Sequence, residues 1–212
     1  MLILDTGRKP TFAPFPNSVF PIHWPGHVWM ALLLGGQTVG ATAVAWLFHI
    51  TPGQVLLPIL LLGVGALFMA TVSLWQRVLG GNHLVAWVPT ILYALFIAIL
   101  SHNSFSVRPV GFDTGILFHP VEYFSLGVLL CWGWHAAPVA CGMWVLAGRV
   151  LAAGAAFAAS DEIHQRFIPG RHSSFFDLSL DILGLATGLA VFLAALELHA
   201  RRRARRAGSA GK

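Results

Sequence analysis

The stretch from Ala159 to Gly188, "ASDEIHQRFIPGRHSSFFDLSLDILGLATG", holds four acidic residues, two arginines and two histidines in an otherwise apolar chain. Only 10% of the 212 residues are charged, 57% are hydrophobic, and the mean hydropathy is +0.74. Half of the eight acidic residues lie between Asp161 and Asp181. Because charge in or near a bilayer is costly, this cluster is a candidate functional site.

The apolar runs around this stretch predict an all-α, polytopic integral membrane protein and exclude an ordinary soluble domain. A membrane-spanning helix needs about 20 mainly apolar residues, and the chain has room for about six such helices. We expect these helices at about residues 24–50, 54–74, 83–100, 116–134, 139–159 and 175–198.

The distribution of charge and proline predicts four segments. They are an N-terminal cytoplasmic arm (1–23), two additional transmembrane helices (24–79), a four-helix membrane domain (80–199) and a basic cytoplasmic tail (200–212). The arm lacks the apolar core of a cleavable signal peptide. Basic residues in the arm, in the loop at Arg77 and in the tail fall on one side, which the positive-inside rule makes cytoplasmic. The tail therefore indicates membrane lipid as a partner and no nucleic acid.

Three sequence motifs combine polar residues at helical spacing. In "FHPVEYFSLG", His119, Glu122 and Tyr123 share one helix face. In "SDEIHQRFIPGR", Asp161 and Gln165 share a face, and "IPGR" predicts a turn that presents Arg171. We therefore expect these motifs to meet near the outer surface of the membrane.

The third motif, "FFDLSLDILGLATG", aligns acidic and small residues on one side of the last helix. Asp177, Asp181 and Gly184 or Gly188 share that side, and the glycines allow close helix approach. An intramembrane pair of aspartates needs cationic or hydrogen-bonding partners. The available cations are Arg149, Arg166, Arg171 and His119.

These motifs, in this order, resemble the VanZ-like family of bacterial membrane proteins. The similarity covers roughly Val85 to Leu198, including "ILSHNS" at the end of the third apolar run. The resemblance implies functional roles for His119, Tyr123, Asp161, Glu162, Gln165, Arg171 and Asp177. It departs at Asp181, where the family usually has Asn. The family is associated with resistance to the glycopeptide teicoplanin, and the resemblance implies an architecture and a site rather than a defined reaction. We expect the chain to lie in a bacterial inner membrane.

Two interpretations of the charged cluster remain open. Its members could form a structural network that holds helices together, or a site that binds or modifies a lipid-linked or cell-envelope ligand. In a catalytic site, Glu122 or Asp161 would be the general base, His119 or His164 would pass the proton, and Arg171 would hold an anionic group. The candidate site residues are His119, Glu122, Tyr123, Asp161, Glu162, Gln165, Arg171 and Asp177.

The sequence predicts no cofactor and no metal site. Cys131 and Cys141 lack ligand spacing, and neither His119 with Glu122 nor Glu162 with His164 has a recognised spacing. The competing hypothesis is an accessory subunit of a photosynthetic or respiratory membrane complex, docked through the arm and the first two helices. In that case other membrane subunits are partners, and His27 and His49, at the two ends of the first helix, could ligate haem or pigment.

Overall fold

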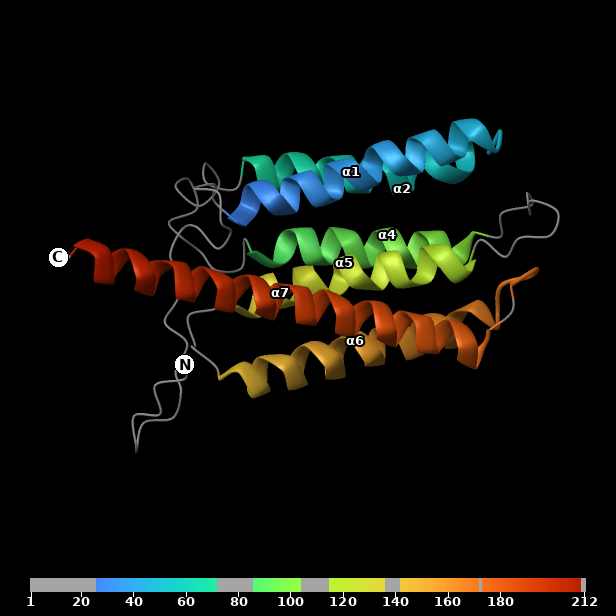
Figure 1. Cartoon of the computed structure of the whole chain (residues 1–212). Coiled ribbons are helices and arrows are strands. Elements are labelled where there is room, and N and C mark those ends of the chain that lie inside the picture. The colour runs from blue at the N-terminus through green and yellow to red at the C-terminus, as the bar shows by residue number, and fades with distance from the viewer. Residues whose placement is uncertain (1–25, 72–85, 104–114, 136–141, 172, 211–212) are drawn as a thin grey trace.

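The computed structural model describes residues 26–71, 86–103, 115–135, 142–171 and 173–210 (Figure 1). Within these residues the regular structure is all helical, and no strand is present. The helices are α1 (Gly26–Leu47), α2 (Pro52–Ala70), α4 (Val88–His102), α5 (Gly115–His135), α6 (Met143–Gln165) and α7 (Phe175–Ala210). The predicted all-α fold class is therefore confirmed.

The structure supports a membrane protein by the length and composition of its helices. Three helical segments in the described part are long and apolar enough to cross a membrane: His27–Leu47, Met143–Gln165 and Phe175–Arg202. The apolar segments in α2 and α4 are shorter. Large apolar side chains such as Trp46 and Trp144 are exposed, as lipid contact would favour. The count of six membrane-spanning helices stays a prediction.

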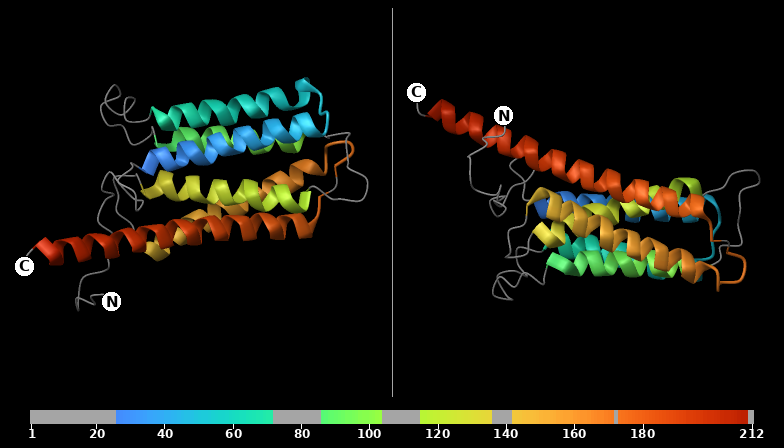
Figure 2. Two further views of the ribbon diagram at one scale, coloured as in Figure 1. Left: turned by 45° about the horizontal axis from the view of Figure 1, so that its top comes forward. Right: turned by 90° about the horizontal axis from the view of Figure 1, so that it is seen from below.

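The helices lie side by side in one bundle (Figures 1 and 2). Helices α1 and α2 pack against each other, and α2 packs on α4. Helices α4, α5, α6 and α7 form a second group, in which α5 and α6 each contact the other three helices. Helix α1 reaches α5 through Gln37, whose Nε2 donates to Ser125 Oγ at 2.5 Å. The arrangement places α1 and α2 on one side of the four helices that carry the charged residues.

Helices α5 and α7 approach so closely that only glycine fits between them. A Cβ atom at Gly184 would lie 2.3 Å from the carbonyl oxygen of Pro120, and one at Gly188 would lie 2.2 Å from that of Phe124. These backbone atoms cannot swing aside as a flexible side chain could. The close approach expected from the glycines of the third motif is therefore confirmed.

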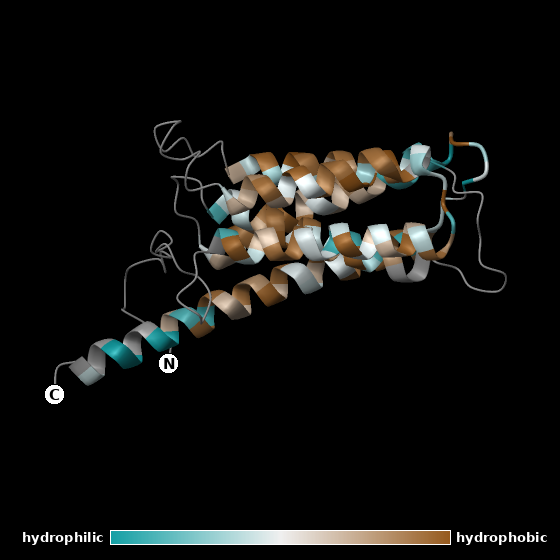
Figure 3. Ribbon diagram, turned by 90° about the horizontal axis from the view of Figure 1, so that it is seen from above, coloured by the Kyte–Doolittle hydropathy of each residue, from teal (hydrophilic) through white to brown (hydrophobic). Residues whose placement is uncertain are grey.

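Two helices run further than the apolar pattern predicts. Helix α6 continues to Gln165, past the expected end at 159, because its last polar side chains are buried against neighbouring helices. Helix α7 continues to Ala210, through most of the expected basic tail. There Arg201 Nε donates to Glu197 Oε1 at 2.7 Å, which is the i, i+4 spacing of a helical ion pair. At about 1.5 Å per residue, α7 is roughly 54 Å long, and its hydrophilic end projects beyond the bundle (Figure 3).

Several sequence predictions fall on residues that the structure does not describe. They concern the N-terminal arm, the loop at Arg77 and the second cysteine, Cys141. Cys131 is described, and it is a buried free thiol on α5.

Candidate functional site

A buried polar cluster lies at the end of the bundle where α4 and α6 end and where α5 and α7 begin (Figure 1). Each helix contributes at least one polar residue to it. The buried members are Ser101, His119, Asp161, Glu162, Gln165 and Asp181. Most candidate residues from sequence are thus brought to one place by four different helices.

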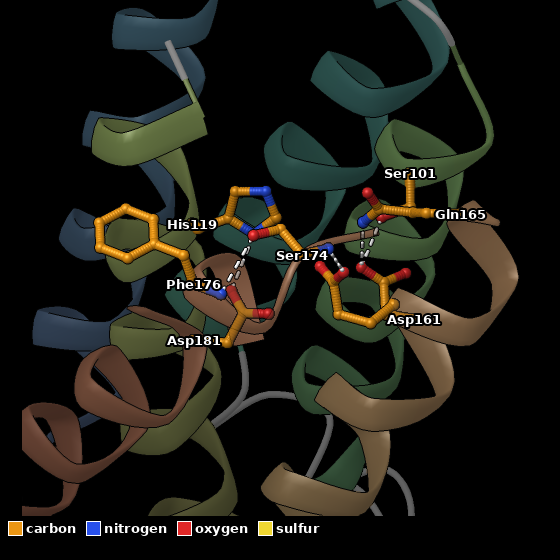
Figure 4. A network of polar contacts seen from close by, with 8 residues as sticks. Ser101, His119, Asp161, Gln165, Ser174, Phe176 and Asp181 are labelled. Atoms are coloured by element: carbon orange, nitrogen blue, oxygen red, sulfur yellow. Dashed lines mark hydrogen bonds and ion pairs between the residues drawn. The ribbon is translucent and has the colours of Figure 1, made fainter. Parts of the chain in front are cut away.

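One half of the cluster, the Asp161 group, consists of Ser101, Asp161 and Gln165. Ser101 Oγ donates to Asp161 Oδ2 at 2.7 Å, and Gln165 Nε2 donates to the same oxygen at 3.0 Å (Figure 4). The first bond joins α4 to α6, and the second follows the i, i+4 spacing on α6. The predicted shared face of Asp161 and Gln165 is therefore confirmed.

The other half, the His119 group, consists of His119, Glu162, Asp177 and Asp181. His119 Nδ1 lies 2.8 Å from Asp181 Oδ1 (Figure 4). Because an ionised carboxylate can only accept, Nδ1 is the donor in this bond. Asp181 is 0% exposed, and its Oδ2 is buried without a hydrogen-bond partner among the described residues. Of the cations considered from sequence, the partner of Asp181 is His119.

Glu162 interacts with Ser173 and Ser174, just before α7, but one of its two carboxylate oxygens has no hydrogen-bond partner among the described residues. Its Oε2 accepts the backbone N–H of Ser174 at 2.9 Å, which joins the end of α6 to the residue before α7. Its Oε1 is buried and has no hydrogen-bond partner in the described part of the chain. His119, Glu162 and Asp177 each offer one metal-ligand atom, and these atoms lie within 4.8 Å of one another. The His119 group therefore combines close acceptor atoms with incomplete hydrogen bonding.

The connection between α6 and α7 begins with the predicted "IPGR" turn. The Arg171 N–H donates to the Ile168 carbonyl at 3.1 Å, and Gly170 has φ of 82°. Proline at the first central position and a positive φ at the second are the signature of a type II turn. Arg171 Nη2 then donates to the Leu100 carbonyl at 2.6 Å. This contact places a cation on the last turn of α4, where the helix dipole favours it.

The other candidate residues belong to neither of these two groups. Glu122 is half-buried on α5, one turn after His119, and Tyr123 is fully buried with its ring 6.2 Å from Phe157. His164 is exposed and stacks on His102 of α4, with 3.3 Å between ring nitrogens. No hydrogen bond among the described residues joins it to His119.

Three residues considered for other roles also lie outside the cluster. Arg149 is exposed on α6, so its side chain is not paired inside the bundle. His27 is half-buried in the first turn of α1, and His49 is exposed just after its last turn, with φ of 53°. No described hydrogen bond joins either histidine to the polar cluster.

Sequence reasoning missed part of this site. Ser101 had no predicted role, although it lies in the quoted "ILSHNS" segment. Asp181 was noted as unusual, but its partner was left open among several cations. Its place on the glycine side of the last helix was predicted, but the sequence does not show that this side faces His119 on α5.

Together, the apolar helices and the buried ionisable cluster define an α-helical membrane protein with a polar site between its helices. The VanZ/LLP1 family model matches residues 98–196, so this part of the chain is similar to the VanZ-like family. The match confirms the resemblance, and it contains every residue of the Asp161 and His119 groups. No curated protein and no solved structure matches the chain.

Proposed function

We propose that this VanZ-like protein binds or modifies a lipid-linked or cell-envelope ligand at the polar cluster. The observation that carries the proposal is the pair of buried carboxylate oxygens, Glu162 Oε1 and Asp181 Oδ2, without hydrogen-bond partners in the described structure. Buried polar atoms in proteins normally have partners, and leaving them without one costs free energy. A bound ligand would supply the missing interactions, whereas a purely structural network would be complete without one.

The proposed location is the outer side of a bacterial inner membrane. The projecting end of α7 carries Arg201, Arg202, Arg205 and Arg206, and it lies at the opposite end of α7 from the cluster (Figure 2). The positive-inside rule favours a cytoplasmic position for these arginines and therefore an outer position for the cluster. Asp181 lies six residues into α7, which is a depth of about 9 Å along the helix. A ligand headgroup at the membrane surface could reach this depth.

The polar residues in and beside the cluster suit different roles in such a site. Asp161 accepts from two donors, so it is less suited than Glu122 to take a proton from a ligand. In the proposed catalytic form, Glu122 is the general base and His119, one turn away, passes the proton. Arg171, beside the end of α4, would contact an anionic group of the ligand.

The test is the ligand that the full-length protein carries from the membrane. The wild-type chain is extracted in mild detergent and studied by native mass spectrometry and by lipid extraction. We expect a bound lipid-linked species that Glu122→Gln and Arg171→Ala reduce about tenfold, the effect of losing roughly 1.4 kcal/mol of binding. Glu197→Gln and Arg149→Ala are the matched controls, because both residues are exposed and lie away from the cluster.

The same samples separate binding from structure. If the two site variants lose the ligand and keep the melting temperature of the wild type, the binding site is supported. If they retain the ligand, or if they fail to accumulate while the controls do, the cluster is a structural network and the proposal is wrong.

The second candidate is an accessory subunit of a larger membrane complex. It is favoured by the position of α1 and α2 at one side of the bundle, where α2 contacts α4 and where Val39, Trp46 and Leu67 are exposed. Lipid could also cover this face. A large coloured particle on native extraction, with haem or pigment absorption lost on substitution of His27 or His49, would favour the subunit. A small colourless particle would favour the stand-alone protein.

A further inference from the structure

We propose that His119, Glu162 and Asp177 bind a divalent transition-metal ion, with Zn²⁺ the best fit. The three residues come from α5, α6 and α7, and their ligand atoms lie within 4.8 Å of one another. The ligand set consists of two carboxylates and one imidazole. Because the three residues lie on different helices, a search for ligand spacing within one helix does not find it. The site goes beyond the proposed function, and it can be tested without knowing the ligand.

The orientation of His119 fits metal binding. Its Nδ1 donates to Asp181 Oδ1 at 2.8 Å, so Nε2 is the ring atom that remains for a metal. A metal-binding histidine commonly donates its other N–H to a carboxylate, which fixes the ring and makes it a better ligand. Asp181 is fully buried and is held opposite His119 by the close contact of α7 with α5 at Gly184. Asp181 is therefore a positioning residue for the proposed site.

Glu162 supplies an independent observation that points to a cation. The residue is 4% exposed, and its Oε2 is fixed by the Ser174 N–H. Its Oε1 is buried and lacks a hydrogen-bond partner among the described residues. A positive ion at this atom would offset both the missing hydrogen bond and the charge of the neighbouring carboxylates. Asp177, in the first turn of α7, is half-buried, so it lies at the edge of the buried cluster.

The donor set decides the kind of metal. Imidazole suits zinc and other late transition metals, and carboxylates alone would suit magnesium, calcium or manganese. Zinc bonds of about 2.0–2.2 Å place tetrahedral donors roughly 3.3–3.6 Å apart, so side-chain movements of about 1 Å would close the site. Three protein ligands leave a fourth position for water or for an oxygen atom of a bound ligand.

The experiment uses the untagged full-length protein, since a histidine tag would itself bind zinc. The protein in detergent is stripped with a chelator, loaded with Zn²⁺ alone, desalted and measured by elemental mass spectrometry and by titration calorimetry. We expect about one zinc per chain. Glu162→Gln and Asp177→Asn should each weaken binding at least about tenfold, and Asp181→Asn by about 10- to 100-fold.

Asp161→Asn is the matched control. It removes the same charge from the same buried cluster, but Asp161 belongs to the Ser101 and Gln165 bonds and not to the ligand set. We expect its zinc affinity to stay close to that of the wild type. If Asp161→Asn lost as much zinc affinity as the ligand variants, zinc would be attracted by the overall negative charge of the cluster. The proposed site would then be wrong.

A measurement on the wild-type protein tests the site even if the variants do not fold. Co²⁺ in a tetrahedral nitrogen and oxygen site absorbs visible light much more strongly than hydrated Co²⁺, and Zn²⁺ should displace it. Absence of this spectrum together with absence of stoichiometric zinc overturns the metal site. The bound ligand is measured separately by its mass. A failure to bind zinc would therefore not contradict the proposed function, and a failure to find the ligand would not contradict the metal site.

Discussion

The two halves of the polar cluster both contain buried carboxylates but differ in how completely those carboxylates are paired. In the Asp161 group, one carboxylate oxygen accepts from both Ser101 and Gln165. In the His119 group, Glu162 and Asp181 each have one paired oxygen and one buried oxygen without a partner among the described residues. The difference teaches that burial of charge alone does not identify a functional site. The unpaired atoms are the reason for proposing a binding role for the His119 group and a structural role for the Asp161 group.

The two groups also connect different helices. The Asp161 group joins α4 to α6, and the His119 group joins α5, α6 and α7. The pairing of His119 with Asp181 depends on the glycine contact between α5 and α7, where no Cβ fits. Glycine is unfavourable inside a helix by about 1 kcal/mol relative to alanine, so its use here indicates that the close approach matters more than local helix stability. Four substitutions can break or sharpen the comparison.

The largest effect is expected for Gly184→Ala. The new Cβ would lie 2.3 Å from the Pro120 carbonyl oxygen, so α7 must move away from α5 and the His119–Asp181 bond must lengthen. We expect a loss of about 3 kcal/mol or more in the free energy of unfolding, at the upper end of overpacking effects. The measurement is unfolding of the detergent-solubilised chain by titration with denaturing detergent.

Gly148→Ala is the control for this substitution. Gly148 is a glycine of α6 with no atom within 4 Å of an added Cβ, so alanine there should be neutral or stabilise by up to about 1 kcal/mol. Equal effects of the two substitutions would show that close contact between α5 and α7 does not hold the His119 group together.

The next largest effect is expected for Asp161→Ala. The substitution leaves the Ser101 hydroxyl and the Gln165 amide without the acceptor that they share. Because unsatisfied buried donors cost about 1–3 kcal/mol, we expect a loss of about 2–3 kcal/mol in the free energy of unfolding. Combining it with Ser101→Ala should cost less than the sum of the two, since the residues are in contact. Additive losses, or no loss from Asp161→Ala, would remove the structural role of the Asp161 group.

Part of this site could be predicted from local sequence. The pairing of Asp161 with Gln165 follows from i, i+4 spacing, the turn before Arg171 follows from Pro169 and Gly170, and the helix contact follows from Gly184. Each of these features depends on residues close together in the chain or on the absence of a side chain. Local patterns of this kind are readable without knowing how the helices pack.

The rest depends on packing between helices. Sequence offered four cations for Asp181, and only the contact between α5 and α7 selects His119. The grouping of His119, Glu162 and Asp177 likewise needs the relative rotation of three helices. The apolar pattern ends the fifth membrane span at about 159, whereas α6 continues to Gln165, because hydropathy counts polar residues as breaks and here they pair with one another inside the bundle.

A smaller effect is expected for Gly170→Ala. Gly170 has φ of 82°, a conformation that costs an L residue roughly 1–2 kcal/mol. The turn should relax and loosen the Arg171 contact with α4, with a loss of about 1 kcal/mol in unfolding free energy. Gly53→Ala, at an open position near the start of α2, is the control and should have little effect. The turn lies beside both groups but contributes no proposed zinc ligand. Zinc affinity should therefore fall less in Gly170→Ala than in Glu162→Gln or Asp177→Asn. A larger fall would mean that the turn is part of the zinc site.

The smallest effect on stability is expected for Asp181→Asn, and it is the sharpest test of the comparison. The amide keeps a carbonyl oxygen to accept from His119 Nδ1, and it removes a buried charge whose second oxygen has no partner in the described residues. We expect the free energy of unfolding to change by about 0.5 kcal/mol or less, since burying a charge without full pairing offsets the value of its hydrogen bond. Zinc affinity should nevertheless fall by about 10- to 100-fold, because the neutral amide makes His119 a weaker ligand. A large loss of stability with unchanged zinc affinity would reverse the assignment: the His119 group would then be structural, and its unpaired oxygens would need another explanation.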